Sequence, residues 1–263
     1  MTQCKQRGFS LIELIIVIIV LAIVGVGTTS FVRFGFEVYQ DTAGRDRQIS
    51  DSRFLIERLT RELRSALPNS VRVSNDGKCV EFMPIVASSS YVDIPVAPEA
   101  ASDQVTVVNS QITATWPSPK IIVYPLRAAD IYSSSSGTSG KIFDIKSIPT
   151  STDNVITLTL ENSVRFLKES PTERYFIVEE PVSYCQVNNE RVMRYQGYSP
   201  AVAQPVPPSV TGVLMAKGQS NVTPFTLLDA TLVRNAVVQL NFEFSYEDEV
   251  LELYNEVHVV NVP

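Results

Sequence analysis

The sequence begins with one long apolar segment. From Phe9 to Val32 the only charged residue is Glu13, and the segment contains no proline. At about 1.5 Å of rise per helical residue it reaches about 36 Å, which exceeds the bilayer core of about 30 Å. The pattern therefore predicts a transmembrane helix over residues 9–32. A carboxylate in hydrocarbon costs on the order of 2–4 kcal/mol, so we expect Glu13 to have a charged partner.

The helical pattern continues beyond the apolar segment. Residues 34–67 contain no proline, and apolar residues recur at helical spacing at Ile49, Ile56, Leu59, Leu63, Ala66 and Leu67. This apolar face needs a partner, since isolated helices are marginal in water, and we expect the partner to be the protein's own sheet. The other faces are expected to be solvated, and they carry Arg53, Glu57, Arg58, Arg61, Glu62 and Arg64. Pro68 ends the pattern, so the whole helix over 9–67 would be about 88 Å long.

Short runs of alternating apolar and polar residues follow, and they predict strands over residues 68–263. Asn75-Asp76-Gly77 favours a tight hairpin between strands 70–73 and 79–83. Residues 237–246 and 251–260 alternate most regularly and predict a C-terminal antiparallel hairpin. Further strands are expected at 91–96, 104–108, 120–126, 155–160, 175–180, 182–187 and 191–195, and flexible insertions near 133–140 and 199–209. The fold class is therefore α+β, a long N-terminal helix packed on an antiparallel β-rich head.

Charge sets the expected topology and excludes one class of partner. The 263-residue chain has a net charge of −6, so it lacks the basic excess typical of proteins that bind nucleic acid. Residues 1–8 carry Lys5 and Arg7 and no acidic residue. By the positive-inside rule this end stays in the cytoplasm, and the head lies on the other side of the membrane.

Residues that could carry catalysis are few. His258 is the only histidine and lies in the last predicted strand among valines, and the chain has no G-x-S-x-G turn and no phosphate-binding glycine loop. The turn Glu247-Asp248-Glu249 lacks the ligand spacing of a calcium loop. Trp116 and the tyrosines of the head are either core residues or a surface that stacks on glycans. We expect no enzymatic activity, no cofactor and no metal site; a membrane-anchored enzyme acting through His258 is the alternative.

The first residues of the chain resemble the class III signal of type IV pilins and type II secretion pseudopilins. A short basic leader ends in Gly8, Phe9 opens the apolar run, and Glu13 stands at the family's spacing. The resemblance implies that prepilin peptidase on the inner membrane removes residues 1–8 and methylates the new amino group of Phe9. It also implies that Glu13 neutralises the N-terminal amine of a neighbouring subunit in a filament, because a buried carboxylate and a buried ammonium are each costly alone.

Two other interpretations of the same segment remain. A plain signal anchor would leave Glu13 unexplained. An ordinary secretory signal peptide, cleaved near Gly25-Val26-Gly27, would have a shorter and uncharged apolar region.

Cysteine usage agrees with an oxidising compartment. Cys4 would leave with the leader, so Cys79 and Cys185 remain as an even pair, and we expect them to form a disulfide. Two buried free thiols are the alternative. A metal pair is disfavoured by the single histidine.

Four internal stretches resemble the minor pilin-like proteins of the mannose-sensitive haemagglutinin (MSHA) pilus system. They are residues 53–70, 79–82, 181–185 and 256–263. The resemblance implies a subunit that primes assembly or caps the filament tip, with other major and minor pilins or pseudopilins and an inner-membrane assembly platform as partners. The apolar helix lacks the bending proline usual in major pilins, which favours a minor subunit. The J-type minor pseudopilin of type II secretion and the W-type minor pilin share this general plan. The J-type pseudopilin and a tip adhesin are the alternatives.

Overall fold

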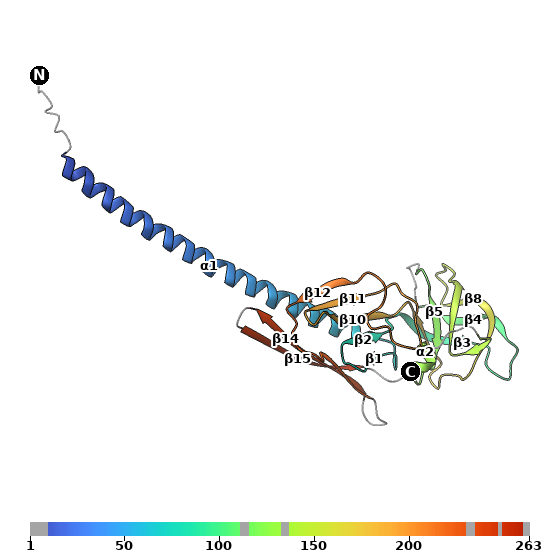
Figure 1. Cartoon of the computed structure of the whole chain (residues 1–263). Coiled ribbons are helices and arrows are strands. Elements are labelled where there is room, and N and C mark those ends of the chain that lie inside the picture. Colours follow the sequence, from blue (N-terminus) through green and yellow to red (C-terminus); the bar gives the residue numbers. More distant parts are fainter. Residues whose placement is uncertain (1–9, 111–115, 133–136, 230–234, 247–248, 260–263) are drawn as a thin grey trace, which may run out of the picture. The chain divides into compact units, whose positions relative to one another are not determined.

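The computed structural model describes residues 10–110, 116–132, 137–229, 235–246 and 249–259. Residues 1–47 and 48–263 form separate units. Helix α1 (Leu11–Arg64) is the one element common to both units, and Figure 1 shows it as an unbroken helix. After α1 the backbone follows a strand-like path. Ala66 pairs with Pro84 in an isolated β-bridge, and Leu67 N donates a 2.7 Å hydrogen bond to Met83 O. The helix therefore ends three residues before the predicted Leu67.

The last turns of α1 pack through one narrow face. Ser52, Leu55, Leu59 and Leu63 are completely buried, and their spacing of three and four residues places them on one side of the helix. Each buried leucine contributes about 1.5–3 kcal/mol relative to an exposed one. The sequence predicted Leu59 and Leu63 correctly but missed Leu55, and Ile56 is only half-buried.

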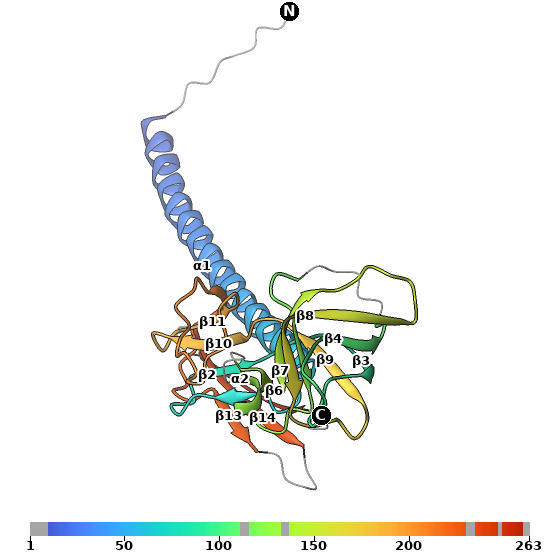
Figure 2. The same ribbon diagram turned by 90° about the vertical axis from the view of Figure 1, so that its right-hand side faces the viewer.

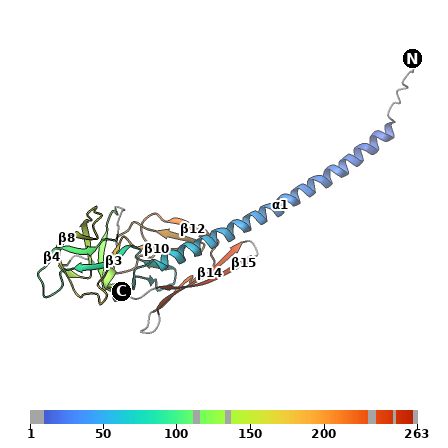
Figure 3. The ribbon, with the colours of Figure 1, turned by 180° about the vertical axis from the view of Figure 1, so that it is seen from behind.

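Two antiparallel sheets enclose this part of α1. One sheet has the order β1-β2-β10-β11-β12, and the other has the order β13-β14-β15. Their bounds are β1 Arg72–Val73, β2 Cys79–Phe82, β10 Val182–Val187, β11 Arg191–Tyr195, β12 Val213–Lys217, β13 Phe225–Leu228, β14 Ala236–Tyr246 and β15 Glu249–Val259. The final turns of α1 run between β12 and β14 (Figure 3). Leu55, Phe82 and Phe242 meet in the shared core.

A closed barrel is inserted between β2 and β10. Its strands are β3 Ile85–Asp93, β4 Ser102–Val108, β5 Lys120–Val123, β7 Ile142–Ser147, β8 Val155–Phe166 and β9 Arg174–Val178. They pair in the order β4-β3-β9-β5-β7-β8, and the additional pairing of β4 with β8 closes the ring (Figure 2). The short strand β6 (Ser139–Gly140) runs parallel to β8. Alternate side chains such as Ile121, Leu158 and Ile177 fill the interior, as expected for a small barrel.

A small third core lies outside the barrel. The neighbouring barrel residue Ile122 points away from the interior and packs with Ile131 and Tyr132 of the short helix α2 (Ala128–Tyr132). Leu67 and Met83 complete this cluster. It joins the end of α1 to the barrel through buried apolar contacts.

Most predicted strands are present, with some different bounds. The N-terminal hairpin turns at Gly77 with φ of +67°, residues 182–187 and 191–195 are β10 and β11 as predicted, and β14 pairs with β15 over eleven residues. Strands β6, β7, β12 and β13 were not predicted, and β6 lies within the insertion expected near residues 133–140. Residues 199–209 form no strand, whereas residues 133–136 of the other insertion and Glu247-Asp248 of the acidic turn lie outside the described residues.

Candidate functional sites

The described chain starts at Ser10, which caps α1. The Oγ atom of Ser10 accepts a hydrogen bond from the Glu13 backbone N at 3.3 Å, and its carbonyl oxygen accepts one from Leu14 N at 3.2 Å. The arrangement is the serine half of a capping box, which the S-x-x-E spacing announces but our sequence interpretation missed. It places the Glu13 carboxylate in the first turn, where the helix dipole favours a negative charge. Gly8 and Phe9 lie outside the described residues.

The apolar half of α1 has no partner in its own unit. Large apolar side chains from Leu11 to Val38 are between 43% and 78% exposed. Thr28 and Thr29 donate hydrogen bonds of 2.8–3.0 Å to backbone carbonyls one turn earlier, including that of Gly25. By length and composition, α1 is the one helix of the described residues that could span a membrane.

Cys79 and Cys185 form a disulfide. They are directly opposite each other on the neighbouring strands β2 and β10, and both are completely buried. The bridge spans a sequence separation of 106 residues. It therefore ties the two strands between which the barrel is inserted.

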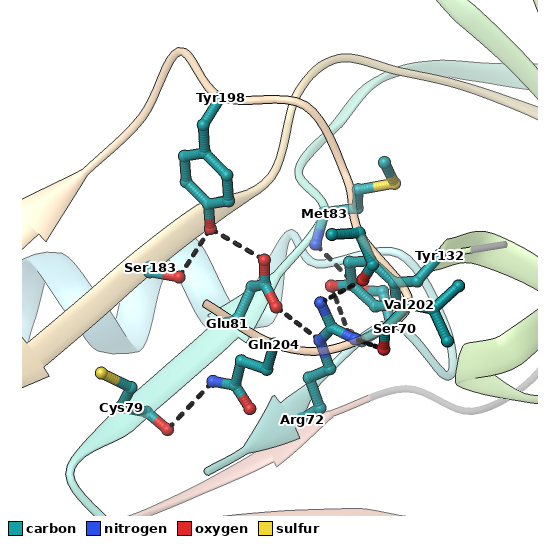
Figure 4. A network of polar contacts seen from close by, with 11 residues as sticks. Ser70, Arg72, Cys79, Glu81, Met83, Tyr132, Ser183, Tyr198, Val202 and Gln204 are labelled. Carbon is teal, nitrogen blue, oxygen red and sulfur yellow. Dashed lines mark hydrogen bonds and ion pairs between the residues drawn. The ribbon is translucent and has the colours of Figure 1, made fainter. Parts of the chain in front are cut away.

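A polar network surrounds the fully buried carboxylate of Glu81 (Figure 4). Arg72 Nε donates to Glu81 Oε2, and the Tyr198 hydroxyl donates to Oε1 at 2.9 Å. Tyr198 also lies 2.6 Å from the Ser183 hydroxyl. Burial, followed by the charge of Glu81, raises the pKa of Tyr198, so this phenol stays protonated and can donate. The carboxylate is thus compensated on both oxygens, as a buried charge requires.

Arg72 extends the network to the proline-rich segment 199–209. Its two terminal nitrogens donate to the carbonyl oxygens of Ala201 and Val202, both at 2.8 Å. Its guanidinium lies 3.7 Å from the ring centroid of Tyr132, whose hydroxyl donates to Ser70 O at 2.8 Å. One arginine therefore ties the irregular segment to β1, β2 and α2.

Residues 3–29 match the family described as the prokaryotic N-terminal methylation motif. The chain carries a class III prepilin signal. This methylation motif indicates a type IV pilin-like or pseudopilin protein that is processed by prepilin peptidase and anchored in a membrane by its N-terminal helix. No curated protein and no solved structure matched the chain.

Beyond the methylation motif, the charged side of α1 differs from expectation. Glu62, predicted to be solvated, is 20% exposed and accepts hydrogen bonds from Arg58 at 2.9 Å and from Arg194 of β11 at 3.0 Å. Burial, followed by the charge of Glu62, raises the pKa of Tyr184 beside this cluster. Glu62 is not solvated because β11 supplies a cation, Arg194, from a distant part of the sequence.

The head residues considered for catalysis or binding lie apart. His258 is an exposed residue of β15 opposite Val237, and Trp116 is half-buried against the barrel core. Glu249 pairs with Tyr246 at the end of the C-terminal hairpin. Within the described ranges, no three His, Cys, Asp or Glu side chains are grouped closely enough to hold a metal ion.

Proposed function

We propose that the chain is a minor type IV pilin-like subunit that acts in assembly, in priming or at the tip of an MSHA-type pilus, without enzymatic activity. The observation that carries this proposal is the methylation motif at the start of a single apolar helix whose only charge before Arg33 is Glu13. The resemblance of residues 53–70, 79–82, 181–185 and 256–263 to the MSHA minor pilin MshO supports the finer assignment.

The proposed topology follows from charge and disulfide chemistry. Lys5 and Arg7 keep the leader in the cytoplasm, α1 crosses the inner membrane once, and the head lies in the periplasm before assembly. The Cys79–Cys185 bridge fits that oxidising compartment.

The proposed assembly step is a pairing of charges. Cleavage after Gly8 creates the amino group of Phe9, and the Glu13 carboxylate of one subunit neutralises the corresponding amine of its neighbour. The Glu13 side chain is exposed on the first turn of α1, as this pairing requires. Other pilins and an inner-membrane assembly platform are the proposed partners.

A J-type minor pseudopilin of type II secretion is the second candidate, because the methylation motif serves both kinds of filament. A chromosomal copy flanked by secretion genes rather than pilus genes would favour it.

The test is complementation of a deletion strain with Glu13→Ala. We expect pili to be lost or reduced by about tenfold or more, since the unpaired terminal amine is costly in hydrocarbon. Glu37→Ala, which removes an exposed charge from the same helix, should leave piliation unchanged. Mass spectrometry of the native protein should show a methylated N-terminal Phe9; an intact leader, or full piliation by Glu13→Ala, would contradict the proposal.

A further inference from the structure

Strand β15 is a long and regular sheet edge. Among the described residues it pairs only with β14, through eleven consecutive residue pairs without a bulge. Residues 249–259 contain neither proline nor lysine. Edge strands usually carry proline, charged side chains such as lysine, or a bulge, because an unprotected edge is a template for another strand. Of these devices, β15 has only the glutamates of its outward face. Within the part of the chain that the structure describes, the outer backbone edge over residues 250–258 therefore offers unpaired N–H and C=O groups.

A groove lies beside this edge, and we call it the β15 groove. Its volume is about 450 Å³, and it is lined by Ile56, Glu57, Thr60, Arg61 and Arg64 of α1 and by Asn255 of β15. Asn255 Nδ2 donates a hydrogen bond of 2.8 Å to Thr60 Oγ1 at the boundary between helix and strand. The inner face of the β13-β14-β15 sheet packs on α1. One further strand beside β15 would therefore place its inward side chains in the β15 groove.

A second copy of β15 is a poor occupant because of its charges. Val250, Glu252, Tyr254, Glu256 and His258 alternate with the half-buried and buried positions and face outward. Antiparallel pairing over the full length would set Glu252 of one copy opposite Glu256 of the other. Parallel pairing in register would set each glutamate opposite itself. Like charges directly opposite each other on a sheet are destabilising, so the outward face fits a strand with Lys or Arg at these positions.

The lining of the β15 groove has a net positive charge, because it holds two arginines and only one glutamate, Glu57. Arg61 and Arg64 are exposed, and neither guanidinium has an ion-pair partner among the described residues. Ile56 contributes apolar surface to the same groove and is half-buried. An inward carboxylate near the two arginines and an inward apolar side chain near Ile56 would match this lining.

We propose that β15 and the β15 groove bind an extended segment of a different protein chain as an added strand. The segment has basic outward side chains, and its inward side chains are apolar with one carboxylate. Main-chain hydrogen bonds to β15 supply affinity, and the side-chain pattern supplies specificity. This inference does not rest on the proposed function, because it uses only the edge strand and the groove.

The probe is a short synthetic peptide that alternates lysines with two valines and one glutamate. Its binding to the full-length protein in a neutral detergent is measured by fluorescence anisotropy, and the protected amides are located by hydrogen exchange. Two further versions are N-methylated on one or the other set of alternate amides, which leaves every charge in place. We expect one N-methylated version to bind about tenfold more weakly and the other to bind normally, since only one set of amides faces β15. Protection should appear in residues 250–258.

Matched variants separate strand addition from general charge attraction. The double variant Glu252→Lys and Glu256→Lys should weaken binding about tenfold through like-charge contacts. The matched double variant Glu161→Lys and Glu169→Lys, which makes the same total charge change at two exposed residues away from β15, should not. Arg64→Glu should weaken binding, whereas Arg53→Glu, outside the groove, should not. Equal binding of all peptide versions, protection elsewhere in the head, or self-association through β15 without peptide would overturn the proposal.

Discussion

The Arg194 Nε atom of β11 lies 3.0 Å from the Glu62 carboxylate of α1, and this ion pair joins the helix to the five-stranded sheet. Arg58, one turn earlier on the helix, donates to the same carboxylate. Both arginines and Glu62 are less than one-third exposed. The apolar face of α1 therefore sets the depth of packing, and the Glu62 cluster adds a directional contact that fixes the helix against β11.

Removal of this carboxylate should be costly. We expect Glu62→Ala to lower the free energy of unfolding by about 1–3 kcal/mol, because two partly buried guanidinium groups lose their acceptor. Urea denaturation of the full-length protein in detergent measures the loss. Glu57→Ala, an exposed change on the same helix, should stay within about 0.5 kcal/mol. Equal effects of the two variants would show that the Arg194 contact contributes nothing.

The buried Glu81 carboxylate supports both stability and the position of segment 199–209. Glu81→Gln should lower the free energy of unfolding by about 3 kcal/mol, since it leaves the Arg72 guanidinium without its anionic partner. Because Arg72 also holds Ala201 and Val202, limited proteolysis should cut within 199–209 sooner than in the wild type. Glu161→Gln serves as the exposed control. An unchanged cleavage pattern would show that Glu81 does not help to hold residues 199–209 in place.

The disulfide should stabilise the head substantially. Replacing both Cys79 and Cys185 with serine should lower the free energy of unfolding by about 2–5 kcal/mol, because the bridge closes a long loop in the unfolded chain. Mature wild-type protein, denatured without reductant, should expose no reactive thiol in a colorimetric assay. Two reactive thiols per chain would contradict the bridge.

Glu179 should make a pH-dependent contribution to the free energy of unfolding. The sign of this contribution should be opposite to that of most carboxylates. Burial, followed by the neighbouring charge of Glu180, raises the pKa of Glu179, and its Oε1 atom is buried with no hydrogen-bond partner among the described residues. Since the folded pKa lies above the unfolded one, folding is disfavoured at this site once the pH rises through these values. Glu179→Gln should therefore melt at a higher temperature than the wild type at about pH 7, and the difference should vanish as the pH falls below the unfolded pKa of about 4.3.

The control for this titration is Glu161→Gln on the exposed face of β8. Its melting temperature should follow that of the wild type at every pH. A Glu179→Gln advantage that persists at low pH would assign the effect to packing rather than to charge.

Local patterns in the sequence predict local structure well. The alternation from Val237 to Tyr246 determines which side chains face α1, and Asp76-Gly77 marks the N-terminal hairpin turn. The methylation motif is equally local, because the leader, the apolar run and Glu13 are contiguous. Ser10 could have been added from its spacing to Glu13.

Contacts between distant segments explain what the sequence did not predict. Closure of the barrel depends on β4 pairing with β8. The sequence of neither strand indicates which other strand it pairs with. Tyr198 and Glu81 are 117 residues apart, so their hydrogen bond is invisible to a reading of local periodicity. A charged residue within the otherwise apolar run from Cys79 to Met83 was the only signal that a buried partner had to exist.

The barrel leaves the five-stranded sheet after Phe82 and the chain returns at Val182, and these two residues are paired across β2 and β10. The two ends of the barrel insertion are thus side by side, so the insertion resembles a domain placed in the loop of a β-hairpin. Recombination could lengthen or exchange such an inserted domain. It could also delete the domain, because a short turn could then connect β2 directly to β10. The sheets that pack on α1 would keep their strand order and connections. The barrel could therefore diverge in evolution without changes in the packing around the helix.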